Sequence, residues 1–143
     1  SRNAGVPSAY PAHLRSLARS PAFRGLITPG GAGTRHLVNA QVLQALGTKG
    51  ILVNVARGSV VDEAALIEAL EKGVIGGAAL DVFEDEPRVP QRLIDLPQVV
   101  LMPHIGSATG QTRQAMADLA FGNVREHFAG RPALTPVPEC AGV

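Results

Sequence analysis

The sequence has little cysteine, few aromatic residues and no long apolar run, and each shortage excludes a class of protein. Cys140 is the only cysteine, so no disulfide can form within the chain. Aromatic residues make up 3% of the 143 residues, which leaves few rings on which nucleic-acid bases could stack. Because there is no bilayer-length apolar segment and no signal peptide, we expect a cytoplasmic protein that binds neither a membrane nor a nucleic acid.

Acidic residues are also missing from the first part of the chain, before Asp62. Seven basic residues give that part a charge of +7, whereas six basic and twelve acidic residues give the part from Asp62 onward a charge of −6. A basic surface of this kind can face the phosphates of a nucleotide or of a nucleic acid. Irregularly spaced arginines are equally typical of an ordinary solvated surface, so the charge alone does not identify a partner.

The composition is that of a folded domain, with 45% hydrophobic and 17% charged residues. Short apolar segments alternate with amphipathic segments, which predicts an α/β fold with a parallel sheet. The segment 51–55 is expected to be buried on both faces, whereas Arg24 and Gly25 interrupt the first predicted strand. The predicted strands are 23–28, 51–55, 78–83 and 99–102. The predicted helices are 40–46, 63–72, 91–95 and one reaching about residue 128, with Asn39, Asp62 and Thr109 as N-caps.

Three successive strands are each followed by a side chain that can do chemistry. Arg57, Glu86 and His104 follow the second, third and fourth predicted strands. Because ligands bind where the carboxyl ends of parallel strands meet, we expect these side chains to lie close together. Each of them alone would be an ordinary solvated or hydrogen-bonded residue. The histidines expected to be of that ordinary kind are His13, His36 and His127.

The three side chains suit the interconversion of a carbonyl and a hydroxyl group beside a carboxylate. Arg57 can bind the substrate carboxylate with two hydrogen bonds and so fix the neighbouring carbonyl. His104 can donate the proton that the carbonyl oxygen needs when hydride reaches its carbon. Glu86, if within hydrogen-bonding reach, favours the charged imidazolium and orients the ring. The hydride has to come from a cofactor, because no side chain supplies one.

The sequence around these positions resembles the D-isomer-specific 2-hydroxyacid dehydrogenase family. The segments concerned are N-V-A-R-G at 54–58, G-A-A-L-D-V-F-E-D-E-P at 77–87 and P-H-I-G-S-A-T at 103–109. Their spacing also agrees with that of the family's arginine, glutamate and histidine. Two further segments, T-P-G-G-A-G-T-R-H-L-V-N at 28–39 and R-P-A-L-T-P-V at 131–137, are most similar to the glyoxylate and hydroxypyruvate reductases, including the branch that reduces hydroxyphenylpyruvate.

The resemblance implies an oxidoreductase acting on a 2-oxoacid such as glyoxylate or hydroxypyruvate, and no metal. Arg57 would bind the carboxylate and carbonyl, His104 would donate the proton, and Glu86 would be its partner. Asp81 would contact the nicotinamide side of the cofactor. Arg2 stands where an acidic residue would favour NAD, and an arginine suits the 2′-phosphate of NADP, so we expect NADP with NAD as the alternative. The positions expected to contact the cofactor are Ser1, Arg2, Thr28, Val55, Ala56, Arg57, Asp81, His104 and Gly106.

The glycine-rich G-x-G-x-x-G turn of the family is absent from the sequence. The resemblance covers the C-terminal half or so of such an enzyme, so we expect a fragment that is inactive alone and belongs to a homodimer when complete. Residues 1–108 would be an incomplete Rossmann-like dinucleotide-binding domain, and 109–143 a long helix and a tail returning toward a missing substrate domain. The alternatives are a dinucleotide-sensing, corepressor-like binding protein, which has the same Arg, Glu and His, and a truncated non-catalytic product.

Overall fold

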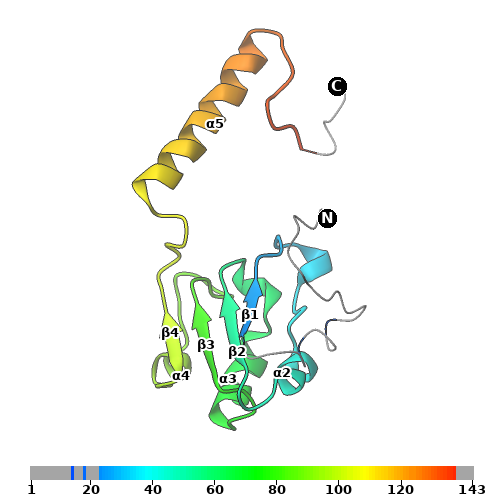
Figure 1. Cartoon of the computed structure of the whole chain (residues 1–143), viewed down its shortest axis with the longest axis vertical. Coiled ribbons are helices and arrows are strands. Elements are labelled where there is room, and N and C mark those ends of the chain that lie inside the picture. The colour runs from blue at the N-terminus through cyan, green and yellow to red at the C-terminus, as the bar shows by residue number, and fades with distance from the viewer. Residues whose placement is uncertain (1–13, 15–17, 19–22, 138–143) are drawn as a thin grey trace. The chain divides into compact units, whose positions relative to one another are not determined.

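The computed structural model describes residues 14, 18 and 23–137. The chain divides into two compact units, Ser1–His104 and Ile105–Val143. The second unit contains one helix, α5 (Gly110–Phe128), among its described residues (Figure 1). The described elements of the first unit are β1 (Phe23–Leu26), η1 (Ala32–Thr34), α2 (Ala40–Leu46), β2 (Ile51–Asn54), η2 (Gly58–Val60), α3 (Glu63–Glu71), β3 (Gly77–Leu80), α4 (Gln91–Ile94) and β4 (Val99–Leu101).

The four strands form one parallel sheet in the order β1-β2-β3-β4, which confirms the predicted α/β fold (Figure 1). The register places Leu26, Asn54, Leu80 and Leu101 in one row across the sheet. Each crossover moves one strand further in the same direction. Because such crossovers are right-handed, all the connecting helices fall on the same face of the sheet. The carboxyl ends of the four strands therefore meet at one edge.

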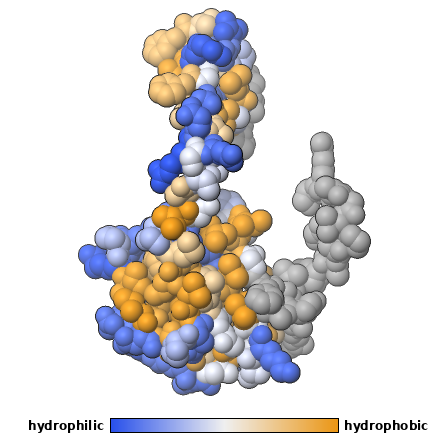
Figure 2. Space-filling view, turned by 60° about the vertical axis from the view of Figure 1, so that its left-hand side comes forward, coloured by the Kyte–Doolittle hydropathy of each residue, from blue (hydrophilic) through white to orange (hydrophobic). Residues whose placement is uncertain are grey.

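One face of the sheet is buried, and the opposite face is partly open among the described residues. Leu52 and Ala78 face the core, whereas Val53 is half-buried and Val100 is 61% exposed. The expectation that 51–55 is buried on both faces was therefore wrong, because the described helices of the first unit cover one face only. Figure 2 shows apolar side chains gathered on the surface of this unit. The helices pack Val42, Leu43, Leu66, Ile67, Ala69, Leu70 and Leu93 into the core.

The first strand is shorter than predicted but is not interrupted. It ends at Leu26, and Arg24 and Gly25 both pair with β2. Gly25 is exposed, and a Cβ at this position would meet no atom within 4 Å. The strand tolerates a glycine there because the position faces open space, so no packing is lost.

Asp81 lies just beyond β3 and not within it, which corrects the predicted strand 78–83. The last hydrogen bond from β4 to β3 is donated by the Met102 N–H to the Leu80 carbonyl, at 2.8 Å. Beyond Leu80, the Asp81 N–H still donates to the Asn54 carbonyl of β2 at 3.0 Å. The chain then enters the loop that carries Glu86.

The three predicted N-caps are confirmed. Asn39, Asp62 and Thr109 precede α2, α3 and α5, and the side-chain oxygen of each accepts a hydrogen bond from the first turn of its helix. The N–H groups that donate belong to Gln41 and Val42, to Ala65 and to Thr112. These local signals set where each helix begins.

In the second unit the segment after α5 folds back along the helix. Asn123 of α5 donates to the Thr135 hydroxyl at 2.9 Å and accepts from the Thr135 N–H at 3.0 Å. Gly122 leaves room for Leu134, whose side chain a Cβ at Gly122 would meet at 2.8 Å. Within the described residues, no helix is both long and apolar enough to cross a membrane.

Gly58, just after β2, lies so close to the Phe83 backbone that no side chain fits at this position. A Cβ there would lie 1.9 Å from the Phe83 carbonyl oxygen, so we expect Gly58→Ala to lower the free energy of unfolding by about 1–3 kcal/mol. Urea unfolding followed by circular dichroism measures the change. Gly33→Ala is the control, because nothing lies within 4 Å of a Cβ there. Equal effects of the two substitutions would contradict the close approach.

Candidate active site

The turn that carries Arg57 is held from inside by Asn54. This side chain is 1% exposed, although it ends a strand of apolar residues. Its Oδ1 accepts from the Ala56 N–H at 3.0 Å, and its Nδ2 donates to the Arg57 carbonyl at 3.1 Å. A buried amide with its hydrogen bonds satisfied fixes the backbone around it. This role of Asn54 was not predicted, although a polar residue at the end of an apolar strand is a signal for one.

The Arg57 side chain lies over Gly30, in the loop after β1. A Cβ at Gly30 would come within 2.9 Å of the Arg57 Cγ, so the glycine leaves room for the arginine stem. The guanidinium Nη1 donates to the Ala56 carbonyl at 2.6 Å. No carboxylate among the described residues forms an ion pair with Arg57, which leaves this cation available for an anionic ligand.

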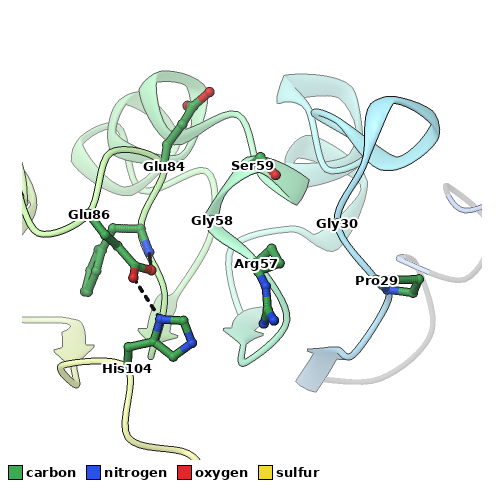
Figure 3. Close-up of a pocket in the computed structure, with 9 residues that line it drawn as sticks. Pro29, Gly30, Arg57, Gly58, Ser59, Glu84, Glu86 and His104 are labelled. Atoms are coloured by element: carbon green, nitrogen blue, oxygen red, sulfur yellow. Dashed lines mark hydrogen bonds and ion pairs between the residues drawn. The ribbon is translucent and has the colours of Figure 1, made fainter. Parts of the chain in front are cut away.

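Glu86 and His104 form a hydrogen-bonded pair, so Glu86 is within the reach on which its expected effect on the ring depends. Glu86 Oε2 lies 2.8 Å from His104 Nδ1, and Glu86 Oε1 accepts from the Phe83 N–H at 3.0 Å (Figure 3). The hydrogen bond to His104 and then the one from Phe83 hold the pKa of Glu86 below its ordinary value. Because an ionised carboxylate only accepts, the hydrogen between the two groups belongs to Nδ1. The other ring nitrogen, Nε2, takes no part in this hydrogen bond, and His104 lines the pocket.

His104 has an unusual backbone conformation. Its φ is 56°, in the left-handed region that residues other than glycine rarely adopt. Such positions cluster at functional sites, where the surrounding structure holds them in place. Here the residue comes directly after Pro103 and turns its ring toward Glu86 (Figure 3).

The structure brings Arg57, Glu86 and His104 together around one pocket of about 620 Å³. These are the three side chains that the strand exits predicted. Figure 3 shows Glu86 pointing toward His104, whereas Glu84 points away from that pair. The other residues of the lining were not predicted, although all of them except Ser59 lie within the segments that resemble the family. The full lining is Pro29, Gly30, Arg57, Gly58, Ser59, Phe83, Glu84, Glu86 and His104.

Most of the described residues expected to contact a cofactor do not line this pocket. Thr28 follows β1, and its buried hydroxyl oxygen has no hydrogen-bond partner among the described residues. Asp81 is 6% exposed and does not line the pocket. Val55 is half-exposed and Ala56 is buried, next to Arg57. Gly106 belongs to the second unit, and Ser1, Arg2 and His13 lie outside the described residues.

A parallel α/β sheet with an arginine and a hydrogen-bonded glutamate–histidine pair at the carboxyl ends of its strands is typical of a Rossmann-like nucleotide-binding domain. A family model for the "D-isomer specific 2-hydroxyacid dehydrogenase, NAD binding domain" matches residues 5–106. The chain therefore belongs to the D-isomer-specific 2-hydroxyacid dehydrogenase family. The resemblance inferred from the motifs is confirmed.

Similar proteins include several reductases of small 2-oxoacids. Over 104 residues, the chain is 60% identical to glyoxylate/hydroxypyruvate reductase A of Arabidopsis thaliana and 56% identical to the hydroxyphenylpyruvate reductase of Plectranthus scutellarioides. Each match covers 73% of this chain and 33% of the relative. The chain thus spans about a third of the length of these relatives.

A solved structure matches the fold closely. The NADPH-dependent glyoxylate/hydroxypyruvate reductase of Sinorhizobium meliloti, crystallised with NADP and malonate, has a TM-score of 0.92 and 48% identity. The match covers 98% of this chain and 44% of the reductase.

The Glu86–His104 hydrogen bond predicts a specific change in titration. His104→Ala removes the main cause of the lowered pKa, so the Glu86 pKa should rise toward its ordinary value of 4.5. Carbon-13 NMR of the glutamate carboxyls against pH measures it. The lowered pKa means that ionised Glu86 stabilises the folded chain above pH 4.5, and that this stabilisation is lost as the pH falls through the folded-state pKa.

The control for this titration is His127→Ala, which changes a histidine in the other unit. It should leave the Glu86 titration unchanged. Stability should also fall less steeply below pH 4.5 in the His104→Ala chain than in the unaltered chain. An unshifted Glu86 titration after loss of His104 would show that the pair does not form in solution.

Proposed function

We propose that this chain carries the substrate-anchoring and acid–base machinery of an NADP-dependent reductase of 2-oxoacids, such as glyoxylate or hydroxypyruvate. The observation that carries the proposal is the grouping of Arg57 with the hydrogen-bonded Glu86–His104 pair around one pocket. The names of the reductases in Arabidopsis thaliana and Sinorhizobium meliloti support the substrate class.

In the proposed reaction Arg57 binds the substrate carboxylate through its guanidinium and holds the adjacent carbonyl in place. His104, protonated on both ring nitrogens, donates the Nε2 proton to the carbonyl oxygen as that oxygen gains negative charge. The ring ends as a neutral imidazole with its remaining hydrogen directed at Glu86. Ionised Glu86 stabilises the imidazolium before the transfer and keeps the ring oriented throughout.

The chain's residues fit a nicotinamide cofactor in part. NADPH, when bound, supplies the hydride that reaches the carbonyl carbon. The buried Thr28 hydroxyl oxygen has no hydrogen-bond partner in the described part of the chain and lies next to the pocket-lining Pro29, so it suits a polar group of a ligand. We propose that Thr28, Val55, Ala56, Arg57, Asp81, His104 and Gly106 hold the cofactor, with Ser1 and Arg2 on its ribose 2′-phosphate.

The proposal extends to the role of the chain as part of a larger protein. The sequence has no glycine-rich turn for the pyrophosphate, and the chain spans 33% of its Arabidopsis thaliana relative. We therefore propose that the chain alone is inactive. The division at residues 108 and 109, the homodimer and the cytoplasmic location stay predictions.

A chimera tests the proposed roles. The matching region of the Sinorhizobium meliloti reductase is replaced by this chain, and NADPH consumption is followed with glyoxylate and hydroxypyruvate. His104→Ala should lower kcat about 10²- to 10⁴-fold, because the proton donor is lost. Arg57→Ala should chiefly raise KM, and Arg57→Lys should restore part of the binding. His127→Ala is the control and should change neither constant. Full turnover by the His104→Ala chimera would rule out the assigned proton donor.

The isolated chain gives a separate prediction. Mixed with NADPH and either 2-oxoacid, it should show no turnover above the rate without protein, because its sequence lacks the glycine-rich turn for the pyrophosphate. The chimera under the same conditions is the positive control. A rate comparable with that of the Sinorhizobium meliloti reductase would contradict the proposed inactivity and leave the residue roles intact.

A further inference from the structure

A charged cluster centred on Glu84, which lines the pocket, takes no part in the proposed reaction. Arg35 and His36, in the loop after β1, both bond to one carboxylate oxygen of Glu84, in the loop after β3. The distances to Glu84 Oε1 are 2.9 Å from Arg35 Nη2 and 2.8 Å from His36 Nε2. The Glu84 side chain is only 26% exposed. His36 is thus a hydrogen-bonded histidine, as the sequence predicted, but its partner lies in the loop that carries Glu86.

The cluster is tied to the wall of the pocket formed by the loop after β1. The Thr34 hydroxyl donates to the Pro29 carbonyl at 2.8 Å, which closes the loop beside the pocket-lining Pro29 and Gly30. The His36 N–H donates to the Ser59 carbonyl at 2.9 Å, so the loop is also fixed to the turn that follows Arg57. His36 has a φ of 49°, which marks a second strained position in this unit.

The cluster is equally tied to the opposite wall. The Glu84 N–H donates to Glu63 Oε2 at 3.2 Å, at the first turn of α3. Its neighbour Phe83 abuts Gly58 through its carbonyl and donates its N–H to Glu86 Oε1. Glu84 therefore holds the short segment that contains Phe83. The hydrogen bond from the Phe83 N–H in turn orients the Glu86 carboxylate. Figure 3 shows that its side chain points away from the Glu86–His104 pair, so it acts from outside the reacting groups.

We propose that Arg35, His36 and Glu84 form a positioning clamp that joins the loop after β1 to the loop after β3, across the Arg57 turn, and thereby keeps Glu86 aligned with His104. Two charge-assisted hydrogen bonds to one half-buried oxygen are stronger than neutral ones and fix its place. Such a restraint matters because catalytic groups have to be held within about 0.5 Å of their working geometry. Glu84 is a positioning residue, and only the catalytic consequence of the clamp rests on the proposed function.

Two substitutions at Glu84 distinguish the effect of the clamp on the alignment of Glu86 from the effect of the Glu84 negative charge. Glu84→Ala and Glu84→Gln both remove the negative charge, but the glutamine keeps an oxygen for Arg35 and His36. Loss of a neighbouring negative charge by itself lowers the pKa of Glu86, whereas loss of the Phe83 and His104 hydrogen bonds raises it. Carbon-13 NMR of the isolated chain should show a raised Glu86 pKa in Glu84→Ala and a value near that of the unaltered chain in Glu84→Gln.

Asp85→Asn is the matched control, because it removes the same charge from the next residue and weakens the exposed pair with Arg88. A Glu86 pKa that is unchanged or lowered in Glu84→Ala overturns the clamp. If Glu84→Ala does not fold, the double variant Arg35→Ala, His36→Ala is read by nitrogen-15 NMR of the His104 ring. Loss of the hydrogen-bonded Nδ1 signal supports the clamp, and its retention overturns it.

The chimera reports the catalytic consequence separately. Glu84→Ala should lower kcat about 10- to 100-fold with little change in KM, because Arg57 still binds the substrate. Glu84→Gln should recover most of the rate, and Asp85→Asn should not alter it. An inactive parent chimera would count against the proposed function and leave the NMR result standing. If the chimera is active and Glu84→Ala leaves its kcat unchanged, the clamp is overturned and the proposed function stands.

Discussion

The close approach of the β2 exit to the loop after β3 is the constraint on which the site depends. Gly58 lies so near Phe83 that a Cβ would come within 1.9 Å of the carbonyl oxygen. This approach lets Arg57 and Glu86, which are far apart in the sequence, line the same pocket. The parallel sheet then supplies His104 from the end of the neighbouring strand. A side chain at position 58 would separate the cation from the acid–base pair.

Much of this arrangement could be predicted from the sequence, because its signals are local. Asn39, Asp62 and Thr109 begin helices through hydrogen bonds that reach no further than three residues. Parallel strands place their carboxyl ends together whatever lies between them, so the grouping of Arg57, Glu86 and His104 followed from the order of strands and helices. The roles proposed for these three residues came from the resemblance of their motifs to the family.

Other features could not be predicted, because they depend on contacts between distant segments. The burial of one face of β2 depends on which side the crossovers fall, and an apolar run does not record that side. The hydrogen bond between His36 and Glu84 joins residues 48 apart, on loops with no periodicity. Asp81 falls outside β3 because the pairing of β3 with β4 ends at the hydrogen bond from Met102 to Leu80, and the sequence of β3 itself does not show where its partner ends. In each case the deciding contact lies on another element.

The balance of charge explains why a glutamate, rather than a neutral group, partners His104 in the proposed reaction. With the imidazole protonated, Arg57, Glu86 and His104 together carry a net charge of +1, which one substrate carboxylate neutralises. Donation of the Nε2 proton to the developing alkoxide turns two charged groups into neutral ones and leaves Arg57 and Glu86 each with one charge. Because the Phe83 N–H also stabilises ionised Glu86, the carboxylate keeps its charge as the ring loses its own. The ionised carboxylate thus favours reprotonation of the His104 ring before the next turnover.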